Sequence, residues 1–331
     1  MLESSVDVLE HIIEKAKIKP KVIVLPEGED ERMIRAARLL VERSICSVTL
    51  LGDVNVIQKN ATAGKISMEG ISVVNPRTSD RLQSYAKSFY DLRKHKGITQ
   101  EQARESLLKS LFFGAMMVRE GEADGSVAGA NNTTADVLRA GIQCIGLAEG
   151  ISVVSSTFLM LVPGWEKPLT FADCGVVPDP DPDQLASIAI ASASTHQKLT
   201  GDIPVVAMLS FSTYGSACHA KVDKVKEATR LVKERAPNLL ADGELQGDSA
   251  LIPSVGSKKA PGSPVAGKAN VLIFPDLDAG NICYKLTQRL AKATALGPLI
   301  QGLKKPAMDL SRGCSAEDIM NVASICCVLS E

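Results

Sequence analysis

Short apolar runs alternate along this chain with segments whose apolar residues recur every three or four positions. Runs of that length are typical of buried strands, and the 3.6-residue recurrence is typical of helices with one buried face. The first run is Lys21–Leu25, and a helix is predicted from about Asp30, with apolar residues from Met33 to Val41 on one face. A second long helical pattern covers Ala220–Glu234. The other predicted strands are Val48–Leu51, Ile71–Val74, Gly125–Ala128, Val153–Leu161, Leu169–Ala172, Pro204–Leu209 and Val271–Phe274.

This alternation predicts the fold class. Apolar strands separated by helices are typical of α/β layers with mostly parallel sheets. A chain of 331 residues exceeds the size at which one hydrophobic core keeps growing, so we expect two domains, with a change near Gly146–Gly150. The stretch Ser254–Gly267, rich in Gly, Pro, Ser and Lys, is predicted to be a surface loop.

Charge and composition argue against several classes of protein. The formal net charge of −1 disfavours a broad electrostatic surface for nucleic acid or anionic lipid, so an anionic ligand would be bound by a few local cations. Segment 1–17 is predicted to be an acidic amphipathic helix and lacks the apolar core of a signal peptide. Eight cysteines without a CxxC pair and four histidines without metal-ligand spacing indicate reduced thiols and no zinc site. We therefore expect a soluble, cytoplasmic protein.

Three familiar ligand motifs are not supported. Gly262–Lys268 has the spacing of a P-loop, but Ala269 replaces the Ser or Thr that would hold magnesium, and a strand follows where a helix is needed. Acidic residues alternate over Asp179–Asp183 as at the start of a calcium loop, yet Gln184 and Ile190 occupy the positions that require Gly and Glu. No GxGxxG follows the first strand, so a Rossmann dinucleotide site has no support.

The segment Asp309–Ile319 carries the most informative local pattern. Ser315, followed three residues later by Asp318 and then by an apolar helical pattern, predicts a helix that starts with a capping box. Free N–H groups and the positive dipole end of such a helix favour anions, and Ser311 and Arg312 directly precede it. A small phosphate ester would fit there. The alternative, that these residues only cap and turn into a helix, stays open.

A second segment, Lys268–Arg289, predicts a buried strand, a turn over Pro275–Gly280 and a helix from about Asn281. Like charges at a spacing of four repel slightly on a helix, so an anionic partner explains the basic cluster better than a solvated face does. The basic face consists of Lys285, Arg289 and Lys292, and the apolar stripe of Ile282, Leu286 and Leu290.

A third segment, Asp124–Arg139, predicts a strand that closes at Gly129 and a helix capped by Thr133 with Asp136. Small residues at this junction would let the backbone approach a ligand, and Arg139 follows in the helix. A plain strand-to-helix turn is the alternative.

Taken together, the motifs resemble those of the phosphate acetyl/butyryltransferase family in its short form. The likeness covers essentially the whole chain in order. It is carried by LPEGEDERMIRAA (Leu25–Ala37), ADGELQGDSA (Ala241–Ala250), GNICYKLTQRLA and ALGPLIQGLKKPAMDLSRGCSAEDI. The resemblance implies two three-layer α/β domains like those of isocitrate and isopropylmalate dehydrogenases, with the active site in an interdomain cleft. It assigns 1–149 with 299–331 to the first domain and 150–298 to the second.

The resemblance also implies a reaction and the residues that perform it. The family exchanges an acyl group, here acetyl, between coenzyme A (CoA) and inorganic phosphate in a ternary complex, without a metal or other cofactor and usually as a homodimer. Asp318 would take the proton of the CoA thiol, whose pKa of about 8.5 leaves it mostly protonated at neutral pH. The remaining roles are stabilisation of the developing oxyanion and the leaving phosphate by Ser311 and Arg289, phosphate binding by Arg312, and CoA binding by Arg93 and Arg139.

Three rivals stay open. A phosphate butyryl- or propionyltransferase would differ only in the volume of its acyl pocket, and one methylene changes selectivity by only about 1–3 kcal/mol. A metal-dependent dehydrogenase of the same architecture would need clustered Asp ligands. A catalytically silent regulatory module is disfavoured by the intact Ser311, Arg312 and Asp318 set.

Overall fold

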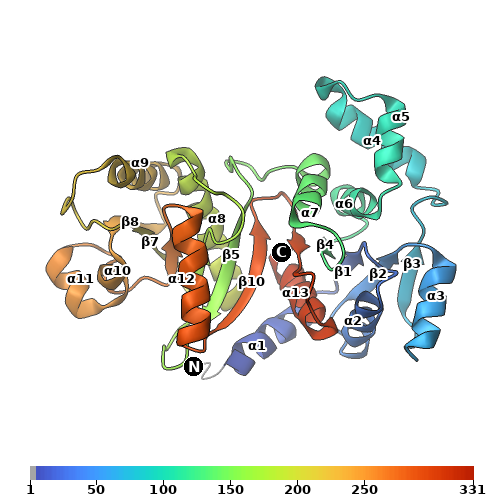
Figure 1. Ribbon diagram of the computed structural model, residues 1–331, viewed down its shortest axis with the longest axis horizontal. Helices are drawn as coiled ribbons and strands as arrows, with labels where there is room; N and C mark the ends of the chain where they lie inside the picture. Colours follow the sequence, from blue (N-terminus) through green and yellow to red (C-terminus); the bar gives the residue numbers. More distant parts are fainter. Residues whose placement is uncertain (1–4) are drawn as a thin grey trace. The chain divides into compact units, whose positions relative to one another are not determined.

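The structure, a computed structural model, describes residues 5–331 and divides by its internal contacts into two compact units. The terminal unit contains Leu9–Gly146 and Leu303–Glu331. The central unit contains Leu147–Gly302 and the described residues before Leu9. Each unit is an α/β sandwich with helices on both faces of its own sheet (Figure 1). No helix within residues 5–331 is long and apolar enough to cross a membrane.

The terminal unit is built on a fully parallel sheet of five strands. Helices α2 (Glu31–Glu42) and α13 (Ala316–Leu329) lie side by side on one face of it (Figure 1). On the other face, α6 (Ser110–Glu120) packs against Val24, whose side chain points opposite to that of Ile23 because side chains alternate along a strand. The strand order is β11 (Ala307–Asp309), β4 (Gly125–Ala128), β1 (Val22–Leu25), β2 (Ser47–Leu51) and β3 (Ile71–Val74).

The other helices of this unit surround that core. They are α1 (Ser5–Ile18), α3 (Val54–Ala63), α4 (Leu82–Arg93), α5 (Gln100–Leu107) and α7 (Thr134–Ala140), with short turns η1 (Lys94–Lys96) and η2 (Gly141–Ile145).

The central unit has a mixed sheet of six strands, in which the first two pairings are antiparallel and the rest parallel. Helices α8 (Pro182–Thr200) and α9 (Ala220–Arg235) cover one face, and α12 (Leu277–Leu290) covers the other with α10 (Gly247–Leu251) and α11 (Pro253–Lys259). The strand order is β10 (Thr294–Gln301), β5 (Ser155–Leu161), β6 (Leu169–Ala172), β9 (Val271–Ile273), β7 (Val205–Leu209) and β8 (Leu240–Leu245).

The predicted α/β fold class and the eight predicted strands are confirmed, and the strand ends differ by at most two residues. Asp30 caps α2 by accepting a hydrogen bond from the backbone N–H of Arg32, and the predicted apolar face of α9 is buried. Strands β8, β10 and β11 were not predicted. In β10, Pro298 lies within a register shift on an edge strand, where proline removes no essential ladder bond but hides the strand from pattern reading.

Two predictions for the central unit are wrong. Half of the supposed surface loop Ser254–Gly267 is helical, because α11 spans Pro253–Lys259, and Ala260 and Val265 are buried. Helix α12 begins at Leu277, capped by Asp276, one turn earlier than predicted. The turn was inferred from Gly280, but a side chain there would collide with the carbonyl oxygen of Asp173, so this glycine permits close packing within a helix.

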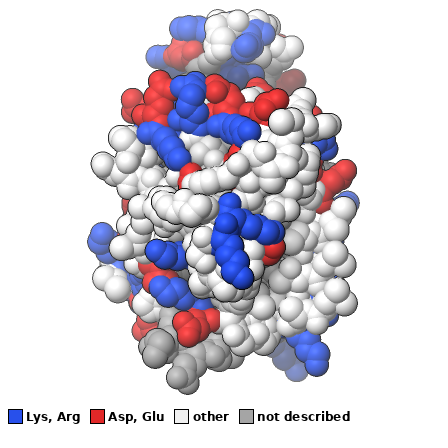
Figure 2. Space-filling view, turned by 90° about the vertical axis from the view of Figure 1, so that its left-hand side faces the viewer, with Lys and Arg blue, Asp and Glu red and all other residues white. Residues whose placement is uncertain are grey.

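Charges of both signs share the surface. On the face in Figure 2, Lys and Arg side chains are interspersed with Asp and Glu. This distribution fits the net charge of −1, so an anionic ligand would have to be bound by a few cations close to it.

Candidate active site

The order of the strands reverses between β1 and β4 in the terminal sheet, although all of its strands run parallel. From β1 the chain continues outward to β2 and β3, whereas β4 and β11 lie on the other side of β1. In open parallel sheets, ligands bind outside the carboxyl ends of the strands at such a switch point. Three loops leave the sheet at that end: Pro26–Asp30 after β1, Gly129–Thr133 after β4, and Leu310–Ser315 after β11. These loops form the candidate active site.

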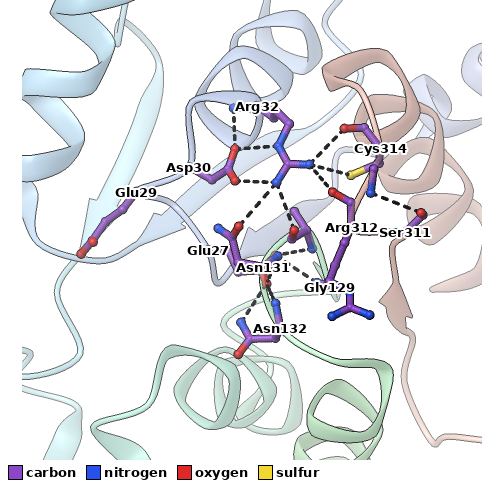
Figure 3. A network of polar contacts seen from close by, with 12 residues as sticks. Glu27, Glu29, Asp30, Arg32, Gly129, Asn131, Asn132, Ser311, Arg312 and Cys314 are labelled. Atoms are coloured by element: carbon purple, nitrogen blue, oxygen red, sulfur yellow. Dashed lines mark hydrogen bonds and ion pairs between the residues drawn. The ribbon is translucent and has the colours of Figure 1, made fainter.

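The carboxylate of Glu27 organises the turn after β4. It accepts hydrogen bonds from the backbone N–H groups of Gly129, Ala130, Asn131 and Asn132 at 2.7–2.9 Å, and from the side-chain amide of Asn132 at 2.7 Å (Figure 3). Glu27 is only 8% exposed. The backbone of this turn was predicted to approach a ligand, but its N–H groups are bound by a carboxylate of the chain itself.

Arg32 joins all three loops (Figure 3). Its guanidinium donates to both carboxylate oxygens of Asp30 at 2.7 and 3.0 Å, and to the carbonyl oxygen of Ala130 at 3.0 Å. It also donates to the carbonyl oxygens of Arg312 at 2.7 Å and Cys314 at 3.2 Å. The planar fork of arginine can serve several acceptors in this way, which a lysine cannot do. Arg32 therefore fixes the course of the backbone on either side of Gly313.

The pKa shifts fit this arrangement. Burial tends to raise the pKa of Asp30, but the hydrogen bonds and charge of Arg32 outweigh burial and hold the pKa below its usual value. The pKa of Arg32 is raised, chiefly by its hydrogen bond to Asp30. Burial raises the pKa of the Cys314 thiol, against the opposing charge of Arg32. The Arg32–Asp30 pair is thus ionised at neutral pH and serves to position the loop.

Ser311 and Arg312 lie in the loop that leads into α13, and Asp318 lies in the first turn of that helix. Ser311 is exposed, and within the described part of the chain its hydroxyl accepts only a long hydrogen bond of 3.3 Å, from the N–H of Gly313. The exposed guanidinium of Arg312 has no hydrogen bond or ion pair within residues 5–331 and extends away from Arg32 (Figure 3). The predicted capping box is confirmed: Asp318 accepts from the N–H of Ser315 at 2.9 Å and from its hydroxyl at 3.0 Å. Within the described chain, a cation without a partner and a hydroxyl that only accepts a long hydrogen bond thus precede a helix N-terminus, which suits a phosphate.

The two arginines predicted to bind CoA occupy different surroundings. Arg139 lines a cavity of about 530 Å³ with Glu27, Glu29 and Lys109, and it forms an ion pair with Asp136 of its own helix at 2.6 Å. Arg93 ends α4 and is partly buried, and its Nε atom has no hydrogen-bond partner within the described chain. It does not line that cavity.

Arg289 belongs to the central unit. It lies in the last turn of α12, and its side chain is exposed. The apolar stripe of the same helix faces solvent, since Ile282, Leu286 and Leu290 are 56%, 53% and 80% exposed. The stripe therefore does not anchor α12, which packs instead through Ala279, Cys283 and Tyr284.

Sequence reasoning missed three residues of this site. Glu27 and Arg32 both lie in the Leu25–Ala37 motif, but their partners could not be read from it. Asp309 ends β11 and is 3% exposed. One of its oxygens, Oδ2, accepts a hydrogen bond of 2.6 Å from the hydroxyl of Thr134, and the other has no partner within residues 5–331.

Metal ligands are not clustered here. A metal-dependent dehydrogenase would require several Asp side chains around one point. Residues 5–331 contain no group of three or more His, Cys, Asp or Glu side chains arranged to hold a metal ion.

Comparison with known proteins identifies close relatives. The sequence pattern of a family described as "Phosphate acetyl/butaryl transferase" matches residues 7–327. The chain is 53% identical over 327 residues to a phosphate acetyltransferase of Acetivibrio thermocellus and 50% identical over 328 residues to one of Thermoanaerobacterium thermosaccharolyticum. These alignments cover 98% of this chain and at least 98% of each relative.

Solved structures show the same likeness. The fold is similar to that of a phosphotransacetylase from Streptococcus pyogenes, with a TM-score of 0.95, 41% identity and coverage of 99% of both chains. A branched-chain phosphotransacylase from Enterococcus faecalis, at 17% identity and a TM-score of 0.66, shares the fold.

Proposed function

Because this chain belongs to the phosphate acetyl/butyryl transferase family, we propose that it exchanges acetyl between CoA and phosphate at the loops after β1, β4 and β11. The chain is an acyltransferase of the phosphate acetyltransferase type, as its relatives match it over nearly their full length. The observation that carries the assignment of the site is the pair of exposed groups just before the N-terminus of α13: the Ser311 hydroxyl, which accepts a long hydrogen bond, and the Arg312 guanidinium, which has no partner within residues 5–331. A catalytically silent regulatory module would not require an exposed hydroxyl and an exposed guanidinium at this position.

The proposed reaction is a direct acyl transfer. The CoA thiol gives its proton to Asp318, and the resulting thiolate attacks the carbonyl carbon of acetyl phosphate. A carbon–sulfur bond forms, the bond from that carbon to the phosphate oxygen breaks, and phosphate leaves with the bonding electrons. In the reverse direction, phosphate attacks acetyl-CoA and the thiolate regains the proton.

Each predicted residue keeps one role in this proposal. Ser311 donates a hydrogen bond to the developing oxyanion. On the strength of the family resemblance alone, the charge of Arg289, a residue of the central unit, is assigned to stabilise the oxyanion and the leaving phosphate. Arg312 holds the phosphate with its fork. Within the described residues, no hydrogen bond reaches Oδ1 of Asp318, because both hydrogen bonds from Ser315 go to Oδ2. CoA is a substrate in this scheme, and no cofactor or metal takes part.

CoA binding is proposed for the cavity beside Arg139. It opens at the switch point of the sheet, and its lining includes Lys109 and Arg139, two cations that suit the phosphates of CoA. The Arg139 side chain is 54% exposed, and within residues 5–331 it pairs with the carboxylate of Asp136 alone, so a phosphate could replace that partner. Arg93, which lies outside the cavity, is proposed to bind CoA on the strength of the family resemblance alone.

An acyl-phosphate panel tests the reaction. Purified protein with CoA and acetyl, propionyl or butyryl phosphate is followed by thioester absorbance, with and without EDTA. We expect acetyl transfer to be fastest and the chelator to have no effect. Faster transfer from butyryl phosphate would indicate a phosphate butyryltransferase. A strict requirement for metal would contradict the proposed metal-free reaction.

A homodimer is proposed through the exposed stripe of α12. Ile282, Leu286 and Leu290 follow one another at intervals of four residues and so form one apolar ridge. A second copy would bury the same ridge in a two-fold interface, which is the common arrangement in soluble oligomers.

All eight cysteines are free thiols, which fits a reducing compartment, and we place the enzyme in the cytoplasm.

The dimer is tested by a charge on the ridge. Light scattering coupled to gel filtration should give twice the chain mass for the wild type and the single-chain mass for Leu286→Glu. The control is Ile203→Glu, another apolar residue of this unit that is 70% exposed but outside the ridge, and it should remain dimeric. A dimeric Leu286→Glu would place the interface elsewhere.

A further inference from the structure

Asp309 is a buried carboxylate without a cation. It is 3% exposed, and no Lys or Arg of residues 5–331 forms an ion pair with it. Its Oδ2 atom receives the 2.6 Å hydrogen bond from Thr134 at the start of α7, whereas Oδ1 is buried without a partner. A buried carboxylate in this state costs stability, and an unpaired buried oxygen calls for an explanation.

Its position connects two loops of the candidate site. Asp309 ends β11, and the next residues are Leu310, Ser311 and Arg312. Oδ1 lies so close to Gly129 that any side chain at that position would collide with it, and Gly129 has a φ of +112°. Asp309 therefore touches the turn after β4 and the first turn of α7, while its own backbone leads into the loop of Ser311.

We propose that Asp309 is a positioning residue for acyl transfer, which holds the turn after β4 and the start of α7 against the loop carrying Ser311 and Arg312. This inference rests on the proposed function and adds a residue to it. The ionised carboxylate accepts the Thr134 hydroxyl strongly, whereas the protonated acid accepts it weakly and adds a hydrogen of its own to a crowded space. Protonation therefore loosens the arrangement.

The surroundings place this change in an accessible pH range. Burial raises the pKa of Asp309 to about 6, with a smaller contribution from the charge of Glu27, whereas the hydrogen bond from Thr134 lowers it. Strand β4 carries no charged residue. The charged groups on α7 are Asp136 and Arg139, which pair with each other. Those at the start of α13 are Glu317 and Asp318, and Asp318 accepts hydrogen bonds from Ser315.

The sign of the stability effect follows. The folded-state pKa lies above the unfolded value, so the folded protein holds the proton more tightly, and stability is lost as the pH rises toward about 6. Above that pH the ionised carboxylate lowers the stability of the folded protein, and a functional role would explain why it is retained. An asparagine side chain has nearly the same shape and no charge, so Asp309→Asn is expected to raise the melting temperature at pH 8 by several degrees. The rise should be smaller at pH 5, where the carboxyl is still ionised in the unfolded chain, and should nearly vanish at about pH 4.

The decisive measurement is the pH profile of kcat in Asp309→Asn, Thr134→Val and Asp124→Asn. The wild type should lose activity below about pH 6, and Asp309→Asn should lack this acid limb and have about one tenth of the wild-type kcat at pH 8. Thr134→Val should move the limb to higher pH, because the hydroxyl that lowers the pKa of Asp309 is gone. Asp124→Asn changes a carboxylate at the other end of β4, which pairs with Lys21, and should keep the wild-type profile.

An unchanged acid limb in Asp309→Asn would overturn the proposal, and so would a melting temperature at pH 8 below that of the wild type. If the wild-type protein showed no acyl transfer, the proposed function would be refuted. The two failures can be distinguished, because the melting temperatures of the variants can be measured without activity.

Discussion

Ser311→Ala is expected to fold normally and to lose about two to three orders of magnitude in kcat, the usual effect of removing one oxyanion donor. The hydroxyl is exposed and accepts a single hydrogen bond of 3.3 Å, from the N–H of Gly313, so its loss should hardly change stability. The KM values should change less than kcat, because the bond to the oxyanion exists chiefly in the transition state. Steady-state kinetics with acetyl phosphate and CoA, alongside a melting curve, measure both effects.

The chain offers a closely matched control. Ser67 is also exposed, and its hydroxyl likewise accepts a 3.3 Å hydrogen bond from the N–H two residues later, that of Glu69. Ser67→Ala should therefore show the same small change in stability and an unchanged kcat. Full activity in Ser311→Ala would show that the oxyanion is stabilised by other groups and would remove the central argument for the site.

Local sequence patterns predicted those parts of the site that depend on neighbours in the chain. The capping box of Ser315 and Asp318 was predictable because its hydrogen bonds span three residues. The strands were predictable because β1, β2 and β4 lie in the interior of a parallel sheet and consist mostly of apolar or small residues. Ser311 and Arg312 were predicted as site residues because they directly precede the N-terminus of α13.

Contacts between distant segments were not predictable. Arg32 binds backbone oxygens of Arg312 and Cys314, which lie 280 and 282 residues away in the sequence, so its motif could not show what it holds. The burial of Asp309 depends on packing with β4 and α7, and its strand has only three residues. Gly280 illustrates the opposite error, since a glycine required by packing was taken for a turn.

Arg32→Ala is expected to have the second large effect and to change stability and catalysis together. Removing the guanidinium leaves the half-buried carboxylate of Asp30 without its ion-pair partner, and three carbonyl oxygens lose the group that donates to them. We expect the free energy of unfolding to fall by about 2–3 kcal/mol, the size of hydrogen bonds to charged groups. The freed loop would displace Ser311 and Arg312, and a displacement of about 1 Å can cost about a hundredfold in rate.

Arg35 provides the matched comparison on the same helix. It forms an exposed i,i+4 ion pair with Glu31 at 2.7 Å, so Arg35→Ala should cost no more than about 0.5 kcal/mol and leave kcat unchanged. Arg32→Lys should fall between Arg32→Ala and the wild type, because lysine keeps the charge but cannot reach Asp30 and three carbonyl groups at once. Urea unfolding and kcat measured on the same preparations separate the cases. If Arg32→Ala and Arg35→Ala lost equal stability, the three loops would have to be held by other contacts, and Arg32 would be only a surface charge.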